Sequence, residues 1–465
     1  MSRRLLMHKP PQTAIILAAG RGRRMWPYDE LRPKAILPVL NQPLIARLVD
    51  DLTAIGIQRL IVVVGHQSQR VKHALTGYEQ VVFVQQESLD GTASAVLAAL
   101  PLIDDEAFLV VYGDLLVDRV DLKAVVQTFA QGDAQLAALV CPLGREDSRD
   151  WLCTSVRAGM VTAIEGHPRE SEYRLGGVYA MHRSTLRYLR DNPGLVANVP
   201  VGGMPPIEAD LAGGLQMAVE EGIGIAAVVA AGPFVDLDKP WHILEANERA
   251  IEAAASSMGD PVAGARISDG ADIRGPVVLE AGASIGARTV VEGPLWVGKD
   301  TVIENGPIIG PGVVIGPGCK VTNYCRIGGG TTIGPLNVVD HCAEISGVTM
   351  DRVYLSHYME YWVVIGSGVD LGAATVCGNL RFDDGQTVHT ILGRREIPRV
   401  AANAVYIGDY CRTGVNAILL PGVKVGPYSC VGPGVIAYED VPARTLLLAR
   451  QELVRKTWGP GRYGW

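Results

Sequence analysis

The 465-residue sequence contains no run of about 18 apolar residues, so it predicts no transmembrane helix. Its first residues, MSRRLLMHKPPQ, lack the sustained apolar segment of a secretory signal. A net charge of -7 argues against general nucleic-acid binding, which needs clustered Lys and Arg. The eight cysteines include no CxxC pair and are expected to be reduced thiols. These absences predict a cytoplasmic protein that binds neither nucleic acid nor a membrane.

What is present is enough apolar sequence for a large core, with 48% hydrophobic and 20% charged residues. At about 150 residues per domain, the length predicts two to three domains. Residues 12–247 alternate short apolar runs with longer amphipathic segments. The predicted strands are Thr13–Leu17, Leu60–Val64, Val81–Val84 and Phe108–Tyr112, and predicted helices include Leu44–Ile55 and Thr92–Leu100. This alternation predicts an α/β fold with a Rossmann-like, mostly parallel sheet and ligands at the carboxyl ends of its strands.

A spacing of six residues takes over from about residue 262. Branched aliphatic residues occupy every sixth position, at Ile267, Ile273, Leu279, Ile285, Val291, Val297, Ile303, Ile309, Ile315, Val321, Ile327, Ile333, Val339 and Ile345. The spacing is lost at 351–364, returns at Ile365, Leu371 and Cys377, and reappears from Ile407 to Val431. This period fits neither a helix nor an ordinary hairpin. It predicts a left-handed hexapeptide-repeat β-helix, in which each coil stacks its aliphatic residue on the next.

These two patterns divide the chain into an α/β domain at 1–247, a linker helix at 248–262, a β-helix at 263–441 and a C-terminal cap at 442–465. Residues 240–256 are expected to be helical, because a proline precedes an Ala-rich amphipathic segment. The ends of a solenoid need cover. Trp458, Tyr463 and Trp465 are candidates for that cover.

The first predicted strand runs into a loop rich in small residues, Leu17-Ala-Ala-Gly-Arg-Gly-Arg-Arg-Met25. Leu17, Ala19, Gly20 and Gly22 would let the backbone approach a ligand closely, and its N–H groups could cradle a triphosphate. The loop lacks the third glycine of a dinucleotide-binding fingerprint. Taken alone it is also compatible with a tight turn.

Two basic residues strengthen the prediction of a phosphate site. Arg24 offers a forked guanidinium suited to phosphate, and Lys34, in Leu31-Arg-Pro-Lys34, offers a compact charge that can reach a second phosphate. Asp114 follows the apolar strand Phe108–Tyr112. A carboxylate at the carboxyl end of a strand is well placed to hold Mg²⁺, although a helix N-cap is a common alternative role.

On these motifs, residues 12–247 resemble the nucleotidylyltransferase domain that joins a sugar 1-phosphate to a nucleoside triphosphate. With the β-helix, nearly the whole chain resembles the bifunctional N-acetylglucosamine-1-phosphate uridylyltransferase/acetyltransferase family, archaeal type. The resemblance implies that Arg24 and Lys34 are catalytic and polarise the phosphates. It implies that Asp114 and Asp236 hold Mg²⁺.

The same resemblance assigns substrate-binding positions. Gln86 and Gly91, with Thr92 beside them, match the segment that reads the pyrimidine, and an amide suits the edge of uracil or thymine. Glu165 and Gly177 match the sugar-binding region. The chain departs from the family there, because a lysine usual after the glutamate and an asparagine usual before the glycine are absent. The sugar therefore stays open between glucose and N-acetylglucosamine types, and the nucleotide between UTP and dTTP.

The β-helix half of the family transfers an acetyl group from acetyl-CoA. By resemblance, His357 is the general base, with Tyr361 beside it and Asn379 in the substrate site. The segments around these residues depart from the family pattern, since Gly-Ala-Gly-Thr has become Gly-Ala-Ala374-Thr and an expected lysine before Asp409 is missing. Acetyl transfer and a purely oligomerising role both stay open. The family is trimeric, which implies a homotrimer or a dimer of trimers.

The leading hypothesis is Mg²⁺-dependent transfer of a nucleotidyl group to a sugar 1-phosphate with release of pyrophosphate, by in-line attack on the α-phosphorus and without a covalent intermediate. One alternative adds acetyl transfer in the β-helix. Another alternative is a regulatory subunit without catalytic activity. The presence of Arg24, Lys34, Asp114 and Asp236 argues against it, since an inactive copy would be free to lose them.

Overall fold

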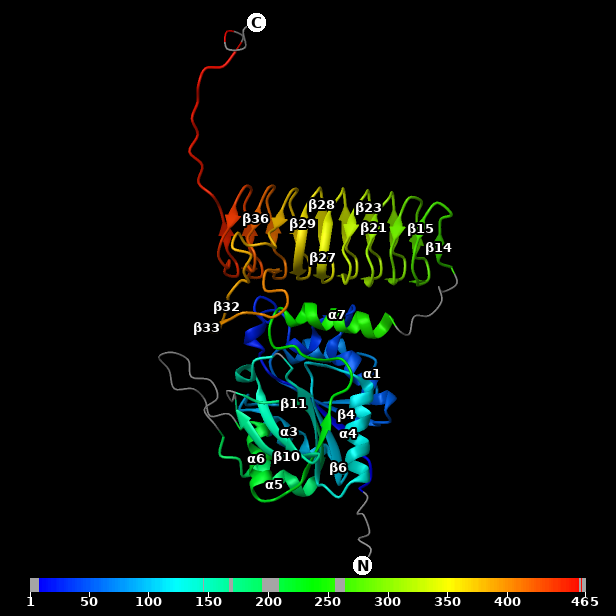
Figure 1. Cartoon of the computed structure of the whole chain (residues 1–465), viewed down its shortest axis with the longest axis vertical. Coiled ribbons are helices and arrows are strands. Elements are labelled where there is room, and N and C mark those ends of the chain that lie inside the picture. The colour runs from blue at the N-terminus through cyan, green and yellow to red at the C-terminus, as the bar shows by residue number, and fades with distance from the viewer. Residues whose placement is uncertain are drawn as a thin grey trace, which may run out of the picture.

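A computed structural model describes residues 8–144, 146–166, 170–194, 209–255, 264–459 and 461. An α/β domain lies below a long β-helix, with one helix, α7 (His242–Ala255), running along the β-helix between them (Figure 1). In the described part of the chain, no helix has the length and apolarity needed to cross a bilayer. The predicted order of an α/β fold followed by a hexapeptide β-helix is confirmed.

The α/β domain is built on a nine-stranded mixed sheet with the order β5-β4-β1-β6-β11-β8-β12-β10-β9. Its strands are β1 (Thr13–Ala18), β4 (Arg59–Val64), β5 (Val81–Gln85), β6 (Ala107–Tyr112), β8 (Leu136–Pro142), β9 (Leu152–Arg157), β10 (Met160–Gly166), β11 (Tyr173–His182) and β12 (Ile225–Val229). Strand β1 pairs in parallel with β4 and β6, whereas β11 is antiparallel to β6. The carboxyl ends of β1 and β6 therefore lie side by side, as the sequence predicts.

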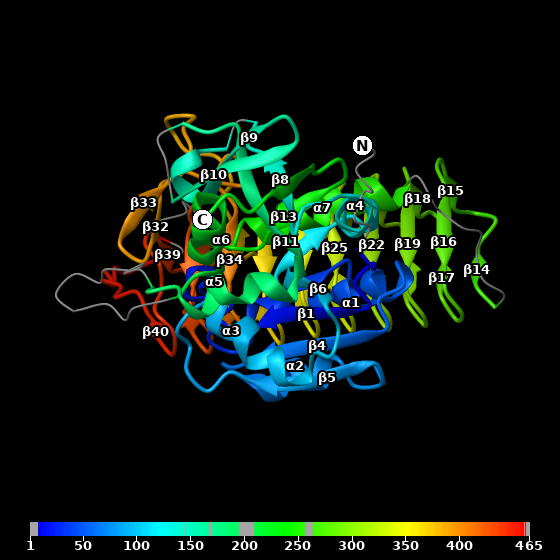
Figure 2. The same cartoon turned by 90° about the horizontal axis from the view of Figure 1, so that it is seen from below.

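Helices cover both faces of this sheet. Helices α1 (Leu44–Ala54), α2 (Ser68–Ala74) and α4 (Arg119–Gln131) pack on one face, and α3 (Thr92–Ala99), α5 (Leu186–Arg190) and α6 (Leu211–Glu220) on the other. Two small ribbons complete the domain, β2 (Pro38–Val39) with β3 (Gln42–Pro43) and β7 (Leu115–Val117) with β13 (Phe234–Asp236). Figure 2 shows the domain against the middle and C-terminal coils of the β-helix.

The β-helix has three columns of short strands. The first column is β14 (Arg266–Ile267), β17 (Ser284–Ile285), β20 (Val302–Glu304), β23 (Lys320–Thr322), β26 (Val338–Asp340), β28 (Tyr354–Ser356), β30 (Asp370–Leu371), β35 (Arg412–Thr413), β38 (Cys430–Val431) and β40 (Leu446–Leu447). The second is β15 (Asp272–Ile273), β18 (Val290–Val291), β21 (Ile308–Ile309), β24 (Arg326–Ile327), β27 (Glu344–Thr349), β29 (Glu360–Ile365), β31 (Val376–Cys377), β36 (Ile418–Leu419) and β39 (Ile436–Ala437). The third is β16 (Val277–Leu279), β19 (Leu295–Val297), β22 (Val313–Ile315), β25 (Thr332–Ile333), the second halves of β27 and β29, β34 (Val405–Ile407) and β37 (Lys424–Val425).

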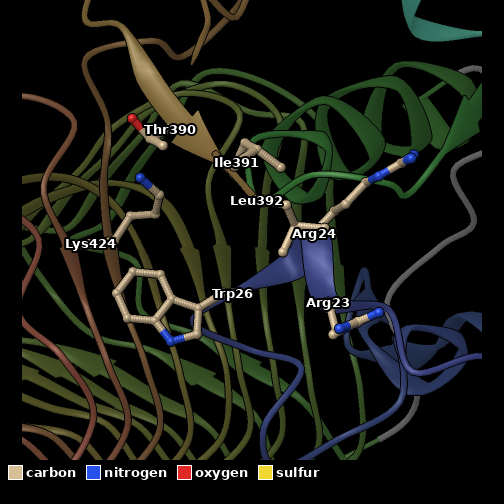
Figure 3. Close-up of a pocket in the computed structure, with 7 residues that line it drawn as sticks. All are labelled: Arg23, Arg24, Trp26, Thr390, Ile391, Leu392 and Lys424. Carbon is tan, nitrogen blue, oxygen red and sulfur yellow. The ribbon is translucent and has the colours of Figure 1, made fainter. Parts of the chain in front are cut away.

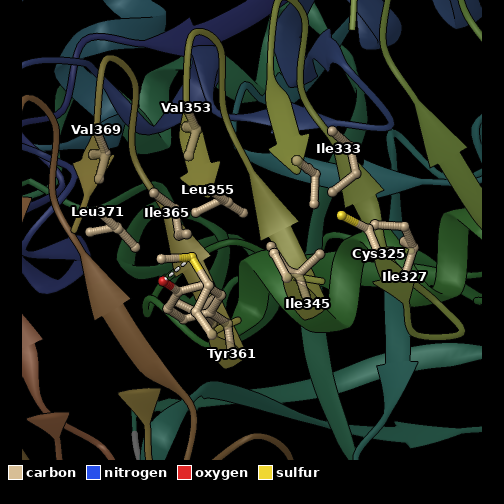
Figure 4. Packing of buried hydrophobic residues seen from close by; sticks show 14 of the residues in the cluster. Cys325, Ile327, Ile333, Ile345, Val353, Leu355, Tyr361, Ile365, Val369 and Leu371 are labelled. Carbon is tan, nitrogen blue, oxygen red and sulfur yellow. Dashed lines mark hydrogen bonds between the residues drawn. The ribbon is translucent and has the colours of Figure 1, made fainter. Parts of the chain in front are cut away.

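Stacked strands pair in parallel with partners 18 residues apart, such as Arg326 with Glu344. One coil therefore spans three of the six-residue periods. The aliphatic positions from Leu279 to Ile345 all lie in one buried cluster inside the coils (Figure 4). Ile267 is 42% exposed, because β14 is the first strand of its column among the described residues.

Both interruptions of the period have a structural cause. At the first, Ile345 pairs with Tyr361 across a shorter coil, so the sequence phase shifts while the stacking continues. At the second, the chain leaves the coil between β31 and β34 and forms a hairpin, β32 (His389–Ile391) with β33 (Arg394–Glu396). The hairpin projects from the β-helix toward the α/β domain (Figure 1).

Helix α7 lies within the helix expected over residues 240–256. The linker helix expected at 248–262 coincides with α7 as far as Ala255, and residues 256–262 lie outside the described part of the chain. It packs between the two halves that it links, because Ala246, Ala250 and Ile243 are buried in a cluster shared with Val364 and Tyr406 of the β-helix. The expected cap from Pro442 stays a proposal. Trp458 is 68% exposed in the single chain, and Tyr463 and Trp465 lie outside the described residues.

Adjacent isoleucines in β21 provide a test of the stacking. Ile309 is fully buried inside the coil, whereas Ile308 points outward and is 45% exposed. We expect Ile309→Ala to destabilise the β-helix by about 2–5 kcal/mol, because it leaves a cavity in a row of stacked side chains. Ile308→Ala should cost less than about 1 kcal/mol. Denaturant unfolding followed by far-UV circular dichroism measures both, and equal losses would contradict the inward assignment.

Candidate nucleotidyl-transfer site

The loop after β1 has the tight geometry expected of it. Gly22 has a φ of 65° and caps the short 3-10 helix Arg23–Met25, closed by a hydrogen bond from Met25 N to Gly22 O. A Cβ on Gly22 would lie 2.4 Å from Lys34 Cγ, whereas one on Gly20 would meet nothing within 4 Å. The glycine at 22 thus lets the Lys34 side chain cross the loop, a close approach within the protein that the sequence did not reveal.

We expect Gly22→Ala to lower nucleotidyl transfer by about 10–100-fold, because displacing Lys34 by about 1 Å misplaces its ammonium. The matched control is Gly159→Ala. Gly159 also has a positive φ of 76°, but a Cβ there meets nothing within 4 Å and the residue lies in the β9–β10 turn. Steady-state rates of pyrophosphate release should separate the two variants. Equal effects would show that backbone strain alone, and not contact with Lys34, makes Gly22 necessary.

Lys34 lies at the centre of the carboxylates at the strand ends. Its Nζ is 2.7 Å from Asp114 Oδ2 and 3.4 Å from Asp238 Oδ1, and Arg24 Nη1 is 3.0 Å from Asp238 Oδ2. Asp236 completes the group, since it ends β13 opposite Leu115, the residue after Asp114. Four residues predicted from separate motifs, Arg24, Lys34, Asp114 and Asp236, are therefore brought together.

The pKa shifts in this group follow from its charges. Burial and the charge of Asp114 raise the pKa of Asp236 above its ordinary value, and Lys34 opposes that shift. Burial works against the charged form of Lys34, but Asp114, Asp238 and Asp236 together raise its pKa. Asp238 is also buried, yet Lys34 and Arg24 lower its pKa. Lys34 thus carries a fixed positive charge among acidic side chains that repel one another.

Asp238 is a member of this group that sequence reasoning missed. It lies two residues after Asp236 in Phe234-Val-Asp-Leu-Asp, so the Asp-x-Asp spacing was a usable signal. Its backbone N–H and that of Lys239 both donate to His242 Nδ1, at 3.0 and 3.3 Å. Burial lowers the pKa of His242 to about 3, so the ring is neutral and accepts both bonds. This turn holds the carboxylate of Asp238 within reach of both Arg24 and Lys34.

The residues expected to read the pyrimidine lie after β5 and at the start of α3. The Gln86 amide is buried and donates to Gly91 O at 3.1 Å and to Asp90 Oδ1 at 3.3 Å. Gly91 has a φ of 121°, and a Cβ there would lie 2.2 Å from Ala209 O. The Thr92 hydroxyl donates to Asp210 Oδ1 at 2.6 Å and accepts from Leu211 N at 2.7 Å. The visible role of Thr92 is thus to join α3 to α6, and base recognition stays a proposal.

The sugar-region residues lie on neighbouring strands of the far half of the sheet. Glu165 is exposed near the end of β10, and Gly177, with a φ of 67°, lies in the irregular part of β11. Arg174, also on β11, is 3% exposed and lies 3.8 Å from the Trp151 ring. Its Nη1 has no hydrogen-bond partner among the described residues. Arg174 lowers the pKa of Asp236, so it adds positive charge near the carboxylates, which no sequence pattern indicated.

The β-helix residues are not brought together as expected. His357 is exposed at a coil corner, and its Nδ1 lies 3.0 Å from Nδ1 of His341, whose ring it stacks on at 4.4 Å. Tyr361 is 2% exposed and points into the β-helix interior, where its hydroxyl donates to Met359 Sδ (Figure 4). The expectation that Tyr361 contacts substrate beside His357 is therefore wrong in the single chain. Its parallel pairing with Ile345 puts it in the inward row. Asn379 is half-buried just after β31.

A pocket of about 180 Å³ lies between the loop after β1 and the hairpin of the β-helix (Figure 3). It is lined by Arg23, Arg24 and Trp26 from the loop, Thr390, Ile391 and Leu392 from the hairpin, and Lys424 from β37. The two halves of the chain thus share the wall beside Arg24.

Comparison with known proteins matches each half of the chain to a family model. Residues 14–189 match the model of the MobA-like NTP transferase domain, and residues 300–335 match the bacterial transferase hexapeptide model of six repeats. The chain carries a nucleotidyltransferase domain and hexapeptide repeats. The MobA-like NTP transferase match covers β1 to α5, which includes Arg24, Lys34 and Asp114.

Relatives match over nearly their full length. A bifunctional sugar-1-phosphate nucleotidylyltransferase/acetyltransferase of Sulfurisphaera tokodaii is 26% identical over 92% of this chain and 98% of its own. The bifunctional protein GlmU of Methanocaldococcus jannaschii is 24% identical over 95% and 98%. A solved UDP-glucose pyrophosphorylase complexed with UDP-glucose aligns with a TM-score of 0.46 at 18% identity, over 52% of this chain and 99% of that one.

Proposed function

We propose that this protein transfers a nucleotidyl group from UTP or dTTP to a sugar 1-phosphate of the glucose or N-acetylglucosamine type, forming a nucleotide sugar and pyrophosphate. The observation that carries the proposal is Lys34, held between Asp114 and Asp238 at the carboxyl ends of the strands, with Arg24 on the same aspartate. The names of the full-length relatives support sugar 1-phosphates as substrates.

Mg²⁺ fits the donor set of the site. In the described part of the chain, no three acidic, His or Cys side chains converge to form a metal cage. Asp114 and Asp236 would supply two oxygen ligands, and Mg²⁺ commonly takes the rest from water and substrate phosphates. The raised pKa of Asp236 beside Asp114 also indicates two carboxylates whose repulsion a cation would relieve. When bound, Mg²⁺ would neutralise part of the triphosphate charge.

The protein's own contribution would be positioning and charge. The loop of Gly20 and Gly22 would hold the phosphates through its backbone N–H groups. Arg24 and Lys34 would leave Asp238 in part and turn to the β- and γ-phosphates, stabilising the pyrophosphate that leaves. The sugar phosphate oxygen attacks the α-phosphorus in line, a new P–O bond forms as the bond to pyrophosphate breaks, and no side chain needs to become covalently attached.

A substrate panel tests the proposal. The full chain, with Mg²⁺, each nucleoside triphosphate and a series of sugar 1-phosphates, should release pyrophosphate with UTP or dTTP and at least one sugar. The comparison of glucose, N-acetylglucosamine and galactose phosphates would define the sugar. No pyrophosphate from any pair would instead support a silent subunit that acts with another enzyme.

Acetyl transfer by the β-helix is a second candidate, favoured by the exposed His357 stacked on His341. Acetyl-CoA would be the donor and an amino-sugar phosphate the acceptor, with His357 taking the ammonium proton. Loss of the free amine of glucosamine 1-phosphate should require acetyl-CoA and disappear in His357→Ala. Tyr361→Phe is the matched control and should retain the activity, since its ring lies in the core. Calorimetry that shows no CoA binding would remove this candidate.

We also propose that the protein assembles as a homotrimer or a dimer of trimers, through the β-helix. Light scattering coupled to size exclusion would report the mass directly.

All eight cysteines are free thiols in the structure, which supports the proposal of a reducing, cytoplasmic location.

A further inference from the structure

The segment that carries Arg24 and Lys34 rests on the β-helix. The Tyr28 hydroxyl donates to Val364 O at 2.8 Å, and Arg32, two residues before Lys34, donates to Ser367 Oγ at 3.1 Å and to Asp409. Asp409 is completely buried. The phosphate-binding segment is therefore fixed from one side by the coils of the other domain.

The hairpin β32–β33 reaches the opposite side of the same site. Glu396 Oε2 lies 2.7 Å from Lys239 Nζ, and the two side chains are only 10% and 7% exposed. Arg394 Nη2 lies 2.5 Å from Asp150 Oδ1, and the His389 ring packs on Trp241 at 5.2 Å. The hairpin is thus docked by a buried ion pair, an exposed one and an aromatic contact.

Lys239 follows Asp238, the aspartate that holds Arg24 and Lys34. Its Nζ is 3.7 Å from Asp238 Oδ2, a longer distance than the 2.7 Å to Glu396. Lys239 therefore has two acidic neighbours, and Glu396 draws its ammonium away from Asp238. Without Glu396, a buried ammonium would have Asp238 as its nearest carboxylate and would compete there with Arg24 and Lys34.

We propose that Glu396, on the β-helix hairpin, is a positioning residue for nucleotidyl transfer in the other domain, acting through Lys239 on Asp238. The inference rests on the proposed function of that site. The β-helix would then contribute to nucleotidyl transfer. Asp238 positions Arg24 and Lys34, and Glu396 of the hairpin keeps Lys239 from competing for Asp238. The shared pocket beside Arg24 agrees with this arrangement (Figure 3).

Full-length variants test the proposal with the nucleotide and sugar phosphate that the wild type uses. Glu396→Gln should lower kcat by about 10–100-fold, as expected when catalytic groups shift by about 1 Å, with a smaller change in KM. Glu396→Asp, which keeps the charge, should restore most of the rate. The control Glu344→Gln removes an exposed partner of Arg326 on the same β-helix and should leave kcat unchanged. Circular dichroism would confirm that each variant is folded.

A double-mutant cycle distinguishes positioning through Lys239 from a general loss of structure. With Lys239→Met present, Glu396→Gln should cause no further loss of kcat, because the competing ammonium is gone. Additive losses, or a Glu396→Gln enzyme as fast as the wild type, would overturn the proposal. Should the wild type release no pyrophosphate at all, the proposed function fails. Calorimetric binding of Mg-UTP and Mg-dTTP still tests Glu396, because displaced Arg24 and Lys34 should weaken nucleotide binding several-fold in Glu396→Gln and not in Glu344→Gln. Equal affinities in the two variants would overturn its role.

Discussion

Lys34→Met is expected to lower kcat/KM for nucleotidyl transfer by about 10³-fold. The Lys34 ammonium lies among the aspartates of the site, 2.7 Å from Asp114. Its raised pKa keeps it charged throughout the neutral range. A fixed charge aimed at a leaving pyrophosphate acts mainly in the transition state, where removing one donor costs about 10²–10³-fold or more. Methionine keeps most of the side-chain volume, so the variant removes charge with little change in packing. Initial rates of pyrophosphate release measure the effect.

Lys72→Met is a suitable control for that experiment. Lys72 lies on α2 with its ammonium 5.9 Å from the Phe83 ring centroid. Among the described residues, no hydrogen bond or ion pair connects Lys72 to Asp114, Asp236 or Asp238. Its replacement should leave kcat/KM within about 2-fold of wild type, as is usual for a surface change. A Lys34→Met enzyme that stays within 10-fold of the control would show that Lys34 serves the fold and not the reaction.

Asp114→Ala should have an equally large effect, with kcat reduced by about 10³-fold, because a ligand to Mg²⁺ contributes several kcal/mol to transition-state stabilisation. The stability of the fold should change little. Asp114 raises the pKa of Asp236 by repulsion, so removing it relieves that repulsion even as Lys34 loses one partner. The free energy of unfolding should change by no more than about 1 kcal/mol. Raising the Mg²⁺ concentration in the assay should recover part of the lost rate if metal binding is what is weakened.

Asp118→Ala is expected to lower stability and leave the rate of nucleotidyl transfer unchanged, the reverse of Asp114→Ala. Asp118 is the N-cap of α4, and its Oδ1 accepts from Val120 N at 2.7 Å. Its loss should cost about 1 kcal/mol of stability and leave the rate nearly unchanged. The two aspartates lie four residues apart in the sequence, so the pair separates metal binding from helix capping. Similar rates in both variants would contradict the assignment of Asp114.

The β-helix was the part of the fold best predicted from sequence, because each of its coils repeats the same local rule. An inward aliphatic residue every sixth position needs no long-range information, and the buried row from Leu279 to Ile345 follows it without exception. The rule fails where a coil changes length. The pairing of Ile345 with Tyr361 shifts the phase and put Tyr361 in the interior, away from the site that the family pattern implied.

The candidate nucleotidyl-transfer site was predicted in part from residues that follow strand ends. Asp114 follows β6 of the main sheet, and the antiparallel ribbon of β7 and β13 brings Asp236 beside it. Lys34 reaches Asp114 from the segment that follows the loop after β1. Arg174 could not be predicted, since its environment of Trp151 and Glu146 depends on how distant strands pack. The same is true of Glu396, which lies in a stretch where the repeat lapses.

The placement of the two halves against each other was also beyond the sequence. The expectation was a helix that links them, yet α7 is one layer of a shared apolar cluster that includes Leu37 from one half and Tyr406 from the other. Buried contacts such as that of Tyr28 with Val364 join segments hundreds of residues apart, and no local pattern records them. The contacts between the segment after β1 and the β-helix therefore emerge only in three dimensions.

Phosphorus NMR of the full chain with Mg²⁺, UTP or dTTP and the preferred sugar 1-phosphate tests the central claim most directly. The account predicts that the triphosphate and sugar phosphate signals fall together while pyrophosphate and the paired resonances of a nucleotide sugar grow in equal amounts. The same spectra should stay unchanged with Asp114→Ala over the same time. Release of inorganic phosphate without a nucleotide sugar, or no reaction with any sugar 1-phosphate, would contradict it.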